Sequence, residues 1–122
     1  MKLSLVGLVL VFVVVAHAQW YNFPREALDG TKDMWRAYKE LKEANWKNSD
    51  KYFHARGNQQ AAQRGPGGRF AATIISNARE LMWKQSSGDN RLDSEADQEA
   101  NRWGRNGGDL SRYRPKGLPD KY

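Results

Sequence analysis

Cysteine is absent from the 122-residue sequence, and histidine occurs only at His17 and His54. The absence of cysteine excludes disulfide bridges and thiolate chemistry. The sequence also has no zinc-binding spacing, no nucleophile elbow and no lysine-containing phosphate loop, which leaves little for catalysis. The glycines around Pro66 suit a turn between two helices better than a phosphate site. We therefore predict no enzymatic activity, no cofactor and no metal site.

Residues that favour β-strands are also scarce, since no valine follows Val15. After that point the β-branched residues are only Thr31, Thr73, Ile74 and Ile75. A sheet would have to form almost without the side chains that suit strands, so we predict an all-α fold. Large aliphatic side chains are few as well, and little apolar area is available to offset the entropy cost of folding. We expect a marginally stable monomer that a partner, a ligand or a homo-oligomer completes, and we favour the homo-oligomer.

The one long apolar run, residues 3–15, directly follows Lys2 and precedes a small-x-small motif that ends at Ala18. This order is typical of a secretory signal peptide, residues 1–18, and the run is too short for a transmembrane segment. We therefore expect a secreted, extracellular protein. Because Lys2 is the only charged residue removed, the net charge falls from +6 to +5. A basic exported chain without a recognition motif is not expected to bind nucleic acid specifically.

Four helices are predicted in residues 19–104, which we expect to form one domain. Their approximate ranges are 20–46, 48–64, 68–85 and 93–104. Pro24 fits the first turn of the first helix, and Gly65 with Pro66 ends the second. Small residues of the second helix, Gly57 among them, allow a close approach between helices. Residues 105–122 form a basic tail that is rich in proline and glycine and has no helical or strand period.

The first and third predicted helices each carry their apolar residues on one arc. A bundle helix buries such an arc in the core, whereas a surface-active helix inserts it into lipid, and the pattern leaves both interpretations open. The shortage of core aliphatics, the aromatic residues on the first arc and the basic strip beside it favour lipid binding. The same arcs could instead line a pocket for a small hydrophobic ligand. The predicted lipid-binding residues are Trp20, Tyr21, Phe23, Leu28, Met34, Trp35, Tyr38, Leu41, Phe70, Ile74, Ile75, Leu81 and Met82.

Basic side chains give a second hypothesis, which is binding of a polyanion. Lys32 and Arg36 lie one helical turn apart, and Arg64 joins them if the first two helices pack antiparallel. Coulomb attraction would hold the polyanion, so its affinity would fall as salt rises. The alternative is that each of these side chains is solvated or paired with an acidic residue. The predicted polyanion-binding residues are Lys32, Arg36 and Arg64 in the helices and Arg112, Arg114 and Lys116 in the tail.

Long runs of specific residues extend over nearly the whole chain after residue 18. In order they include 33–38 (DMWRAY), 43–46 (EANW), 49–58 (SDKYFHARGN), 61–68 (AAQRGPGG), 75–80 (ISNARE), 96–98 (ADQ), 103–105 (WGR) and 114–122 (RPKGLPDKY). Together these runs strongly resemble the serum amyloid A family. Runs of this length are far more specific than a short motif.

The resemblance implies a secreted acute-phase apolipoprotein that associates with high-density lipoprotein. It implies a four-helix bundle with an irregular C-terminal tail that wraps the bundle, and a tendency to form oligomers and amyloid. Members of the family also bind retinol, heparin-like glycosaminoglycans and bacterial surfaces, and cell-surface receptors are expected partners. A role in innate immunity through the basic clusters is therefore the alternative to lipid carriage.

The chain departs from the family at residues 19–26, where Pro24 and Arg25 interrupt a stretch that is otherwise continuous, apolar and rich in phenylalanine. This interruption weakens the prediction of helix for residues 20–23, ahead of Pro24. It also argues against amyloid formation, because proline cannot donate to a β-ladder and charge opposes the stacking of strands.

Overall fold

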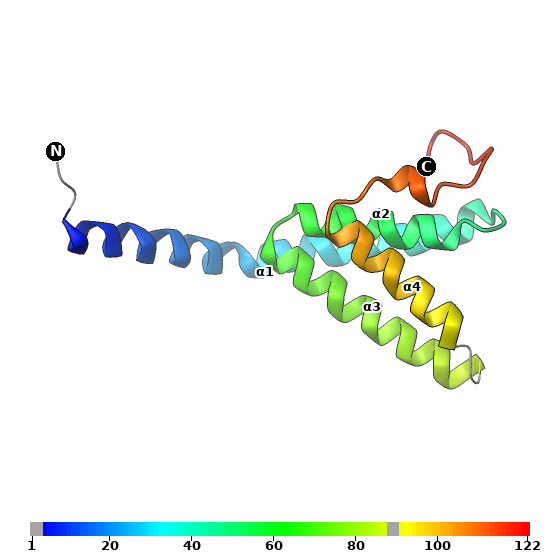
Figure 1. Cartoon of the computed structure of the whole chain (residues 1–122), viewed down its shortest axis with the longest axis horizontal. Coiled ribbons are helices and arrows are strands. Elements are labelled where there is room, and N and C mark those ends of the chain that lie inside the picture. The colour runs from blue at the N-terminus through cyan, green and yellow to red at the C-terminus, as the bar shows by residue number, and fades with distance from the viewer. Residues whose placement is uncertain (1–3, 88–90) are drawn as a thin grey trace.

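The computed structural model describes residues 4–87 and 91–122, and Figure 1 shows how its helices are arranged. They are α1 (Leu5–Ala44), α2 (Asp50–Gln63), α3 (Pro66–Ser87), α4 (Arg91–Arg105) and the short 3-10 helix η1 (Leu110–Arg112). No strand occurs in the two described ranges. The prediction of an all-α fold is therefore confirmed.

Helix α1 begins much earlier than the sequence predicted. It starts at Leu5, where the Ser4 side chain accepts a hydrogen bond from the Gly7 amide, and it continues through Pro24. Residues 20–44 are helical, as predicted, but Pro24 lies inside α1 and not in its first turn, so that placement is wrong. An interior proline loses one hydrogen bond and strains the preceding turn, but packing supports α1 here, because the Phe23 ring lies 5.5 Å from that of Phe70 in α3. The first part of α1 projects beyond the other helices (Figure 1, blue).

The turn between α2 and α3 depends on Gly65, whose φ of 124° suits only glycine. Helix α3 then begins at Pro66, ahead of the predicted start near Gly68, because proline is well suited to the first helical position. The Gly67 amide donates a 2.9 Å hydrogen bond to Oε1 of Glu26 in α1. Glu26 thus pairs one of the free amides at the start of α3 and ties α1 to this turn.

Small residues allow the helices to approach one another closely. A Cβ atom on Gly57 of α2 would lie 2.7 Å from the Cβ of Ala37 in α1. A Cβ atom on Gly104 of α4 would lie only 2.0 Å from the carbonyl oxygen of Ala55 in α2. Helix α1 packs against α2 and α3, and α2 packs against α4. The predicted role of small residues in the second helix is therefore confirmed.

The interior is unusually polar for a small helical protein. Its buried apolar residues include two small clusters, Met34 with Ala61 and Ala72, and Tyr52 with Phe53 and Leu118. Polar residues that are at most 1% exposed include Asp33, Ser49, Asn58, Ser76 and Asn101. Asn58 donates a 3.0 Å hydrogen bond to Asn101, so polar groups here are paired with one another. The shortage of large aliphatic residues is thus reflected in a small apolar core.

The C-terminal tail lies against α1 and α2, where hydrogen bonds fasten it. Arg114 donates to the hydroxyl of Tyr52 at 2.8 Å and to the carbonyl of Leu118 at 3.1 Å. Tyr52 donates in turn to the carbonyl of Tyr122, and the Tyr122 hydroxyl donates to Glu43 of α1. Arg114 belongs to the predicted polyanion-binding set, but in this structure it anchors the tail.

Candidate functional site

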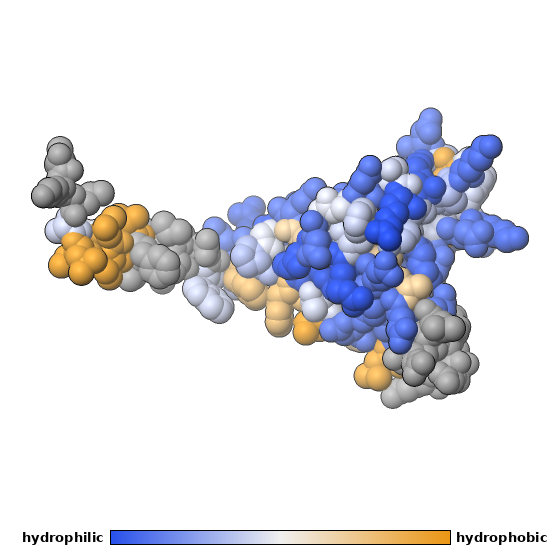
Figure 2. Space-filling view, in the orientation of Figure 1, coloured by the Kyte–Doolittle hydropathy of each residue, from blue (hydrophilic) through white to orange (hydrophobic). Residues whose placement is uncertain are grey.

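Exposed apolar side chains gather along α1 and α3, which pack side by side. The contact between Phe23 and Phe70 joins the two helices at this surface. Orange patches in Figure 2 lie beneath α1 near the start of α3 and again near the far end of α3. We call this surface the apolar face. Its members are between 51% and 80% exposed, and they are Trp20, Tyr21, Leu28, Trp35, Phe70, Ile74, Leu81 and Met82.

The remaining predicted lipid-binding residues are less accessible. Phe23 is partly exposed. Tyr38 and Ile75 are also partly buried and pack against the cluster around Met34, and Leu41 packs against the cluster around Phe53. Met34 itself is fully buried, because its side of α1 meets α2 and α3. Its placement on the lipid-binding surface is therefore corrected, since Met34 is a core residue in this structure.

Basic side chains surround Trp35 on α1. An open hollow in the surface is lined there by Thr31, Lys32, Trp35, Arg36 and Lys39. Within the described part of the chain, the ammonium groups of Lys32 and Lys39 form no hydrogen bond or salt bridge. An apolar ring flanked by such cations suits a surface that carries both apolar and anionic groups.

Arg64 lies close to Arg36, as antiparallel packing of the first two helices predicted, but Asp33 stands between their charges. The carboxylate of Asp33 is 2.8 Å from Nε of Arg64 and 3.4 Å from Nη1 of Arg36. Hydrogen bonds to this carboxylate raise the pKa of Arg64 above its usual value. The fold therefore partly neutralises both guanidinium groups, and Lys32 is the freer cation of the three.

The three predicted cations of the tail have different surroundings. The Arg112 guanidinium lies 4.4 Å from the centre of the Trp103 ring and 3.4 Å from Glu99. Arg114 is occupied by the tail anchor described above. Lys116 is exposed. Of the three, only Lys116 is an exposed cation for which no contact is described above.

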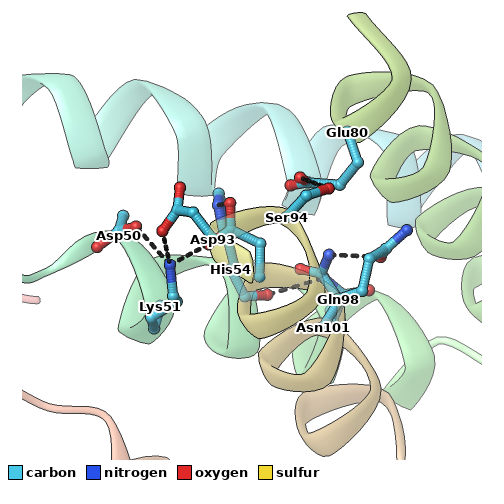
Figure 3. Close-up of polar contacts among 10 residues, drawn as sticks. Asp50, Lys51, His54, Glu80, Asp93, Ser94, Gln98 and Asn101 are labelled. Atoms are coloured by element: carbon cyan, nitrogen blue, oxygen red, sulfur yellow. Dashed lines mark hydrogen bonds and ion pairs between the residues drawn. The ribbon is translucent and has the colours of Figure 1, made fainter. Parts of the chain in front are cut away.

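A partly buried ionic cluster between α2 and α4 was missed by the sequence analysis (Figure 3). Lys51 donates to Asp50 at 3.1 Å, to Asp93 at 3.0 Å and also to Asp97. Although partial burial disfavours its charge, hydrogen bonds to these carboxylates raise the pKa of Lys51 well above its usual value. Burial alone would raise the pKa of Asp97, but contacts with His54 and Lys51 lower it to about 2.

The sequence held only a partial signal for this cluster. Asp50 and His54 are one turn apart on α2, and Asp93 and Asp97 are one turn apart on α4, so each pair shares a helical face. Nothing in the spacing shows that the two faces meet, because Lys51 and Asp97 are 46 residues apart. Only the packing of α2 on α4 brings them together.

These observations define a class of protein: a small, basic, all-helical chain that keeps an amphipathic surface of aromatic and aliphatic side chains beside lysines outside its core. None of the described helices has an apolar segment long enough to cross a bilayer.

The model of the family "Serum amyloid A protein" matches residues 21–122. Serum amyloid A-3 protein of Oryctolagus cuniculus is 58% identical over 124 residues, and the match covers 100% of both chains. Serum amyloid A-5 protein of Mesocricetus auratus is 63% identical over 103 residues, which are 84% of this chain and 100% of the relative. Serum amyloid A protein of Bos taurus is 55% identical over 125 residues, which cover 95% of this chain and 96% of the relative. The chain belongs to the serum amyloid A family, and the resemblance drawn from its motifs is confirmed.

Proposed function

We propose that the protein is a secreted acute-phase apolipoprotein that binds phospholipid and high-density lipoprotein through the apolar face. The exposure of Leu28 and Trp35 on α1 beside Phe70 and Ile74 on α3 is the observation that carries this proposal. Each large apolar side chain contributes about 1.5–3 kcal/mol when it leaves water, so the face has a strong tendency to be covered. The flanking lysines would reach headgroup phosphates while their stems lie along the acyl boundary.

The proposal includes the organisation of the chain. Residues 1–18 act as a signal peptide, residues 19–104 form a four-helix bundle, and residues 105–122 wrap that bundle as a tail. Two features support this division. The first part of α1 projects away from the other helices, so its removal leaves their packing in place (Figure 1). The tail is held to α1 and α2 by Arg114 and Tyr122.

Replacing Ile74 by aspartate is expected to weaken binding to phosphatidylcholine vesicles by at least about tenfold, because an apolar contribution of about 1.5–3 kcal/mol is lost and a charge enters the acyl boundary. Co-flotation with vesicles and a blue shift of tryptophan fluorescence measure the binding. Ser111→Asp is the matched control, since it adds the same charge in η1, which packs on α2. Equal binding of the two variants would contradict the proposed face.

A second candidate function is binding of heparin-like glycosaminoglycans or bacterial surfaces, and the unpaired lysines around Trp35 favour it. The double variant Lys32→Ala/Arg36→Ala is expected to elute from immobilised heparin at lower salt, because two cations that would contact the polyanion are lost. Lys47→Ala/Lys121→Ala removes the same net charge elsewhere and serves as the control. If both double variants elute at the same salt concentration, retention follows net charge and the Trp35 surface is not the site.

Self-association and a small hydrophobic ligand would use the same surface. A homo-oligomer that pairs apolar faces would bury them from water, and a ligand such as retinol would lie between the paired faces. Sedimentation velocity on the Ile74→Asp variant tests whether the apolar faces pair. We expect this variant to form a smaller assembly than the unaltered protein.

A further inference from the structure

Although the sequence predicted no metal site, we propose that Asp50, His54 and Asp97 form a binding site for a divalent transition-metal ion, represented here by zinc. Asp50 and His54 lie one turn apart on α2, and Asp97 belongs to α4. Each residue offers one ligand atom, and these atoms all lie within 4.8 Å of one another. One imidazole nitrogen and two carboxylate oxygens form a donor set that zinc accepts, whereas calcium and magnesium prefer oxygen ligands alone. This site is independent of the proposed lipid-binding face.

The His54 ring is buried and presents a nitrogen to the proposed site. Its side chain is only 4% exposed, Nδ1 has no hydrogen-bond partner, and Nε2 points at Oδ2 of Asp97 from 3.7 Å, beyond hydrogen-bonding distance. A buried imidazole nitrogen without a hydrogen bond, here Nδ1, is costly. Zinc bonds of about 2.0–2.2 Å place the ligands of a tetrahedral site about 3.4 Å apart. The distance between His54 Nε2 and Asp97 Oδ2 is already close to that separation.

The surroundings of the site favour a cation. A cavity of about 140 Å³ is lined by Asp50, His54, Arg79, Glu80, Asp93 and Asp97. Burial raises the pKa of Glu80, and Ser94 donates a 2.8 Å hydrogen bond to this carboxyl group. The aspartates of the cavity outnumber its neighbouring cations, Lys51 and Arg79. The open cavity also leaves room for a water molecule as a fourth ligand.

Lys51 contacts one oxygen of Asp50 and one of Asp97, and a metal ion would bind the other oxygen of each carboxylate. Its ammonium group donates to Oδ2 of Asp50 and Oδ1 of Asp97, which leaves the second oxygen of each carboxylate without a contact to Lys51. The second oxygen of Asp97, Oδ2, lies 3.7 Å from Nε2 of His54. Asp50 is only partly buried in the first turn of α2, so its side chain can rotate toward the ion. The ammonium charge nevertheless opposes metal binding.

Titration with zinc chloride near neutral pH, followed by proton NMR, tests the proposal on protein purified from cells that express the full chain. His17 lies in the proposed signal peptide, so the mature chain shows a single imidazole C2–H signal, that of His54. We expect this signal to shift or broaden as one zinc ion binds per chain, and we expect magnesium chloride to leave it unchanged. An unaltered His54 signal in excess zinc would overturn the proposal.

Two conservative variants separate ligation from the general effect of charge. Asp50→Asn and Asp93→Asn each remove one negative charge beside Lys51, but only Asp50 is a proposed ligand. By calorimetry, Asp50→Asn is expected to lower zinc affinity by at least about tenfold, and Asp93→Asn by less than about fivefold. Equal losses in the two variants would mean that zinc is held by diffuse charge, which would overturn the site.

The variant Lys51→Met tests the same site in the opposite direction, because it does not require the loss of a ligand. Removing the ammonium group takes away a competing cation and frees the remaining carboxylate oxygens, so zinc affinity is expected to rise several-fold. Circular dichroism checks that the helices are retained. Unchanged or weaker zinc binding by a folded Lys51→Met protein would contradict the arrangement proposed here.

Discussion

Replacing Phe53 by alanine is expected to lower the free energy of unfolding by about 3–5 kcal/mol, the usual cost of truncating a fully buried phenylalanine. Phe53 is 0% exposed, and its ring lies 5.2 Å from that of Tyr52 and 5.5 Å from that of Tyr122. The guanidinium group of Arg56 lies 4.9 Å from the same ring. Because this core is small and includes the tail, few neighbours can fill the cavity. Urea unfolding followed by circular dichroism measures the loss.

Phe70→Ala is the matched control, since the same side chain is removed from a position that is 54% exposed. Because the contact with Phe23 is lost, its effect on the free energy of unfolding is expected to be about 1 kcal/mol, well below that of Phe53→Ala, while binding to vesicles weakens because Phe70 belongs to the apolar face. The pair of variants thus separates stability from lipid binding. Equal destabilisation by both would show that Phe70 contributes as much to the fold as Phe53, which would contradict its place on the apolar face.

Replacing Gly104 by alanine is expected to lower the free energy of unfolding by about 3 kcal/mol or more, which is at or above the largest usual cost of adding atoms to a packed core. The added Cβ would lie 2.0 Å from the carbonyl oxygen of Ala55 and 2.8 Å from its Cα. These are backbone atoms, so no side-chain rotation relieves the contact and α4 must move away from α2. Helix propensity acts in the opposite direction, since alanine is favoured over glycine by about 1 kcal/mol. A net loss would therefore report the close approach itself.

Arg102→Ala is the control for this prediction. It also places alanine in the last turn of α4, but at an exposed position where the change is expected to stay within about 0.5 kcal/mol. Thermal unfolding monitored by circular dichroism compares the two variants. A Gly104→Ala protein as stable as Arg102→Ala would mean that α2 and α4 lie farther apart than the structure shows.

The sequence by itself determined the class of fold and the position of most helices. The scarcity of β-branched residues after Val15 excluded a sheet, and the 3.6-residue period of apolar positions located the helical faces, because both properties are local to the chain. The same period identified the apolar arcs that contain Trp35 and Ile74, and both side chains are exposed in the structure. It could not separate Trp35 from its buried neighbour Met34, since both lie on a single wide arc and the depth of each depends on where other helices pack.

Helix boundaries at proline were harder to predict. Pro24 has a strong local preference for a first turn, yet α1 passes through it, because tertiary packing of Phe23 on Phe70 supports the helix around the proline. At Pro66 the local preference and the observed start of α3 agree. A propensity is a weak prior that packing reverses when enough surface is buried.

Only the tertiary structure decided which polar groups meet. The pairing of Asp33 with Arg64 and of Lys51 with Asp97 joins residues 31 and 46 positions apart. These contacts depend on which faces of α1, α2 and α4 are packed together, and that choice rests on small residues such as Gly104 that permit close approach. Periodicity describes one helix at a time, whereas a site between helices exists only once the helices are placed, because its ligands converge through packing and not through spacing in the chain.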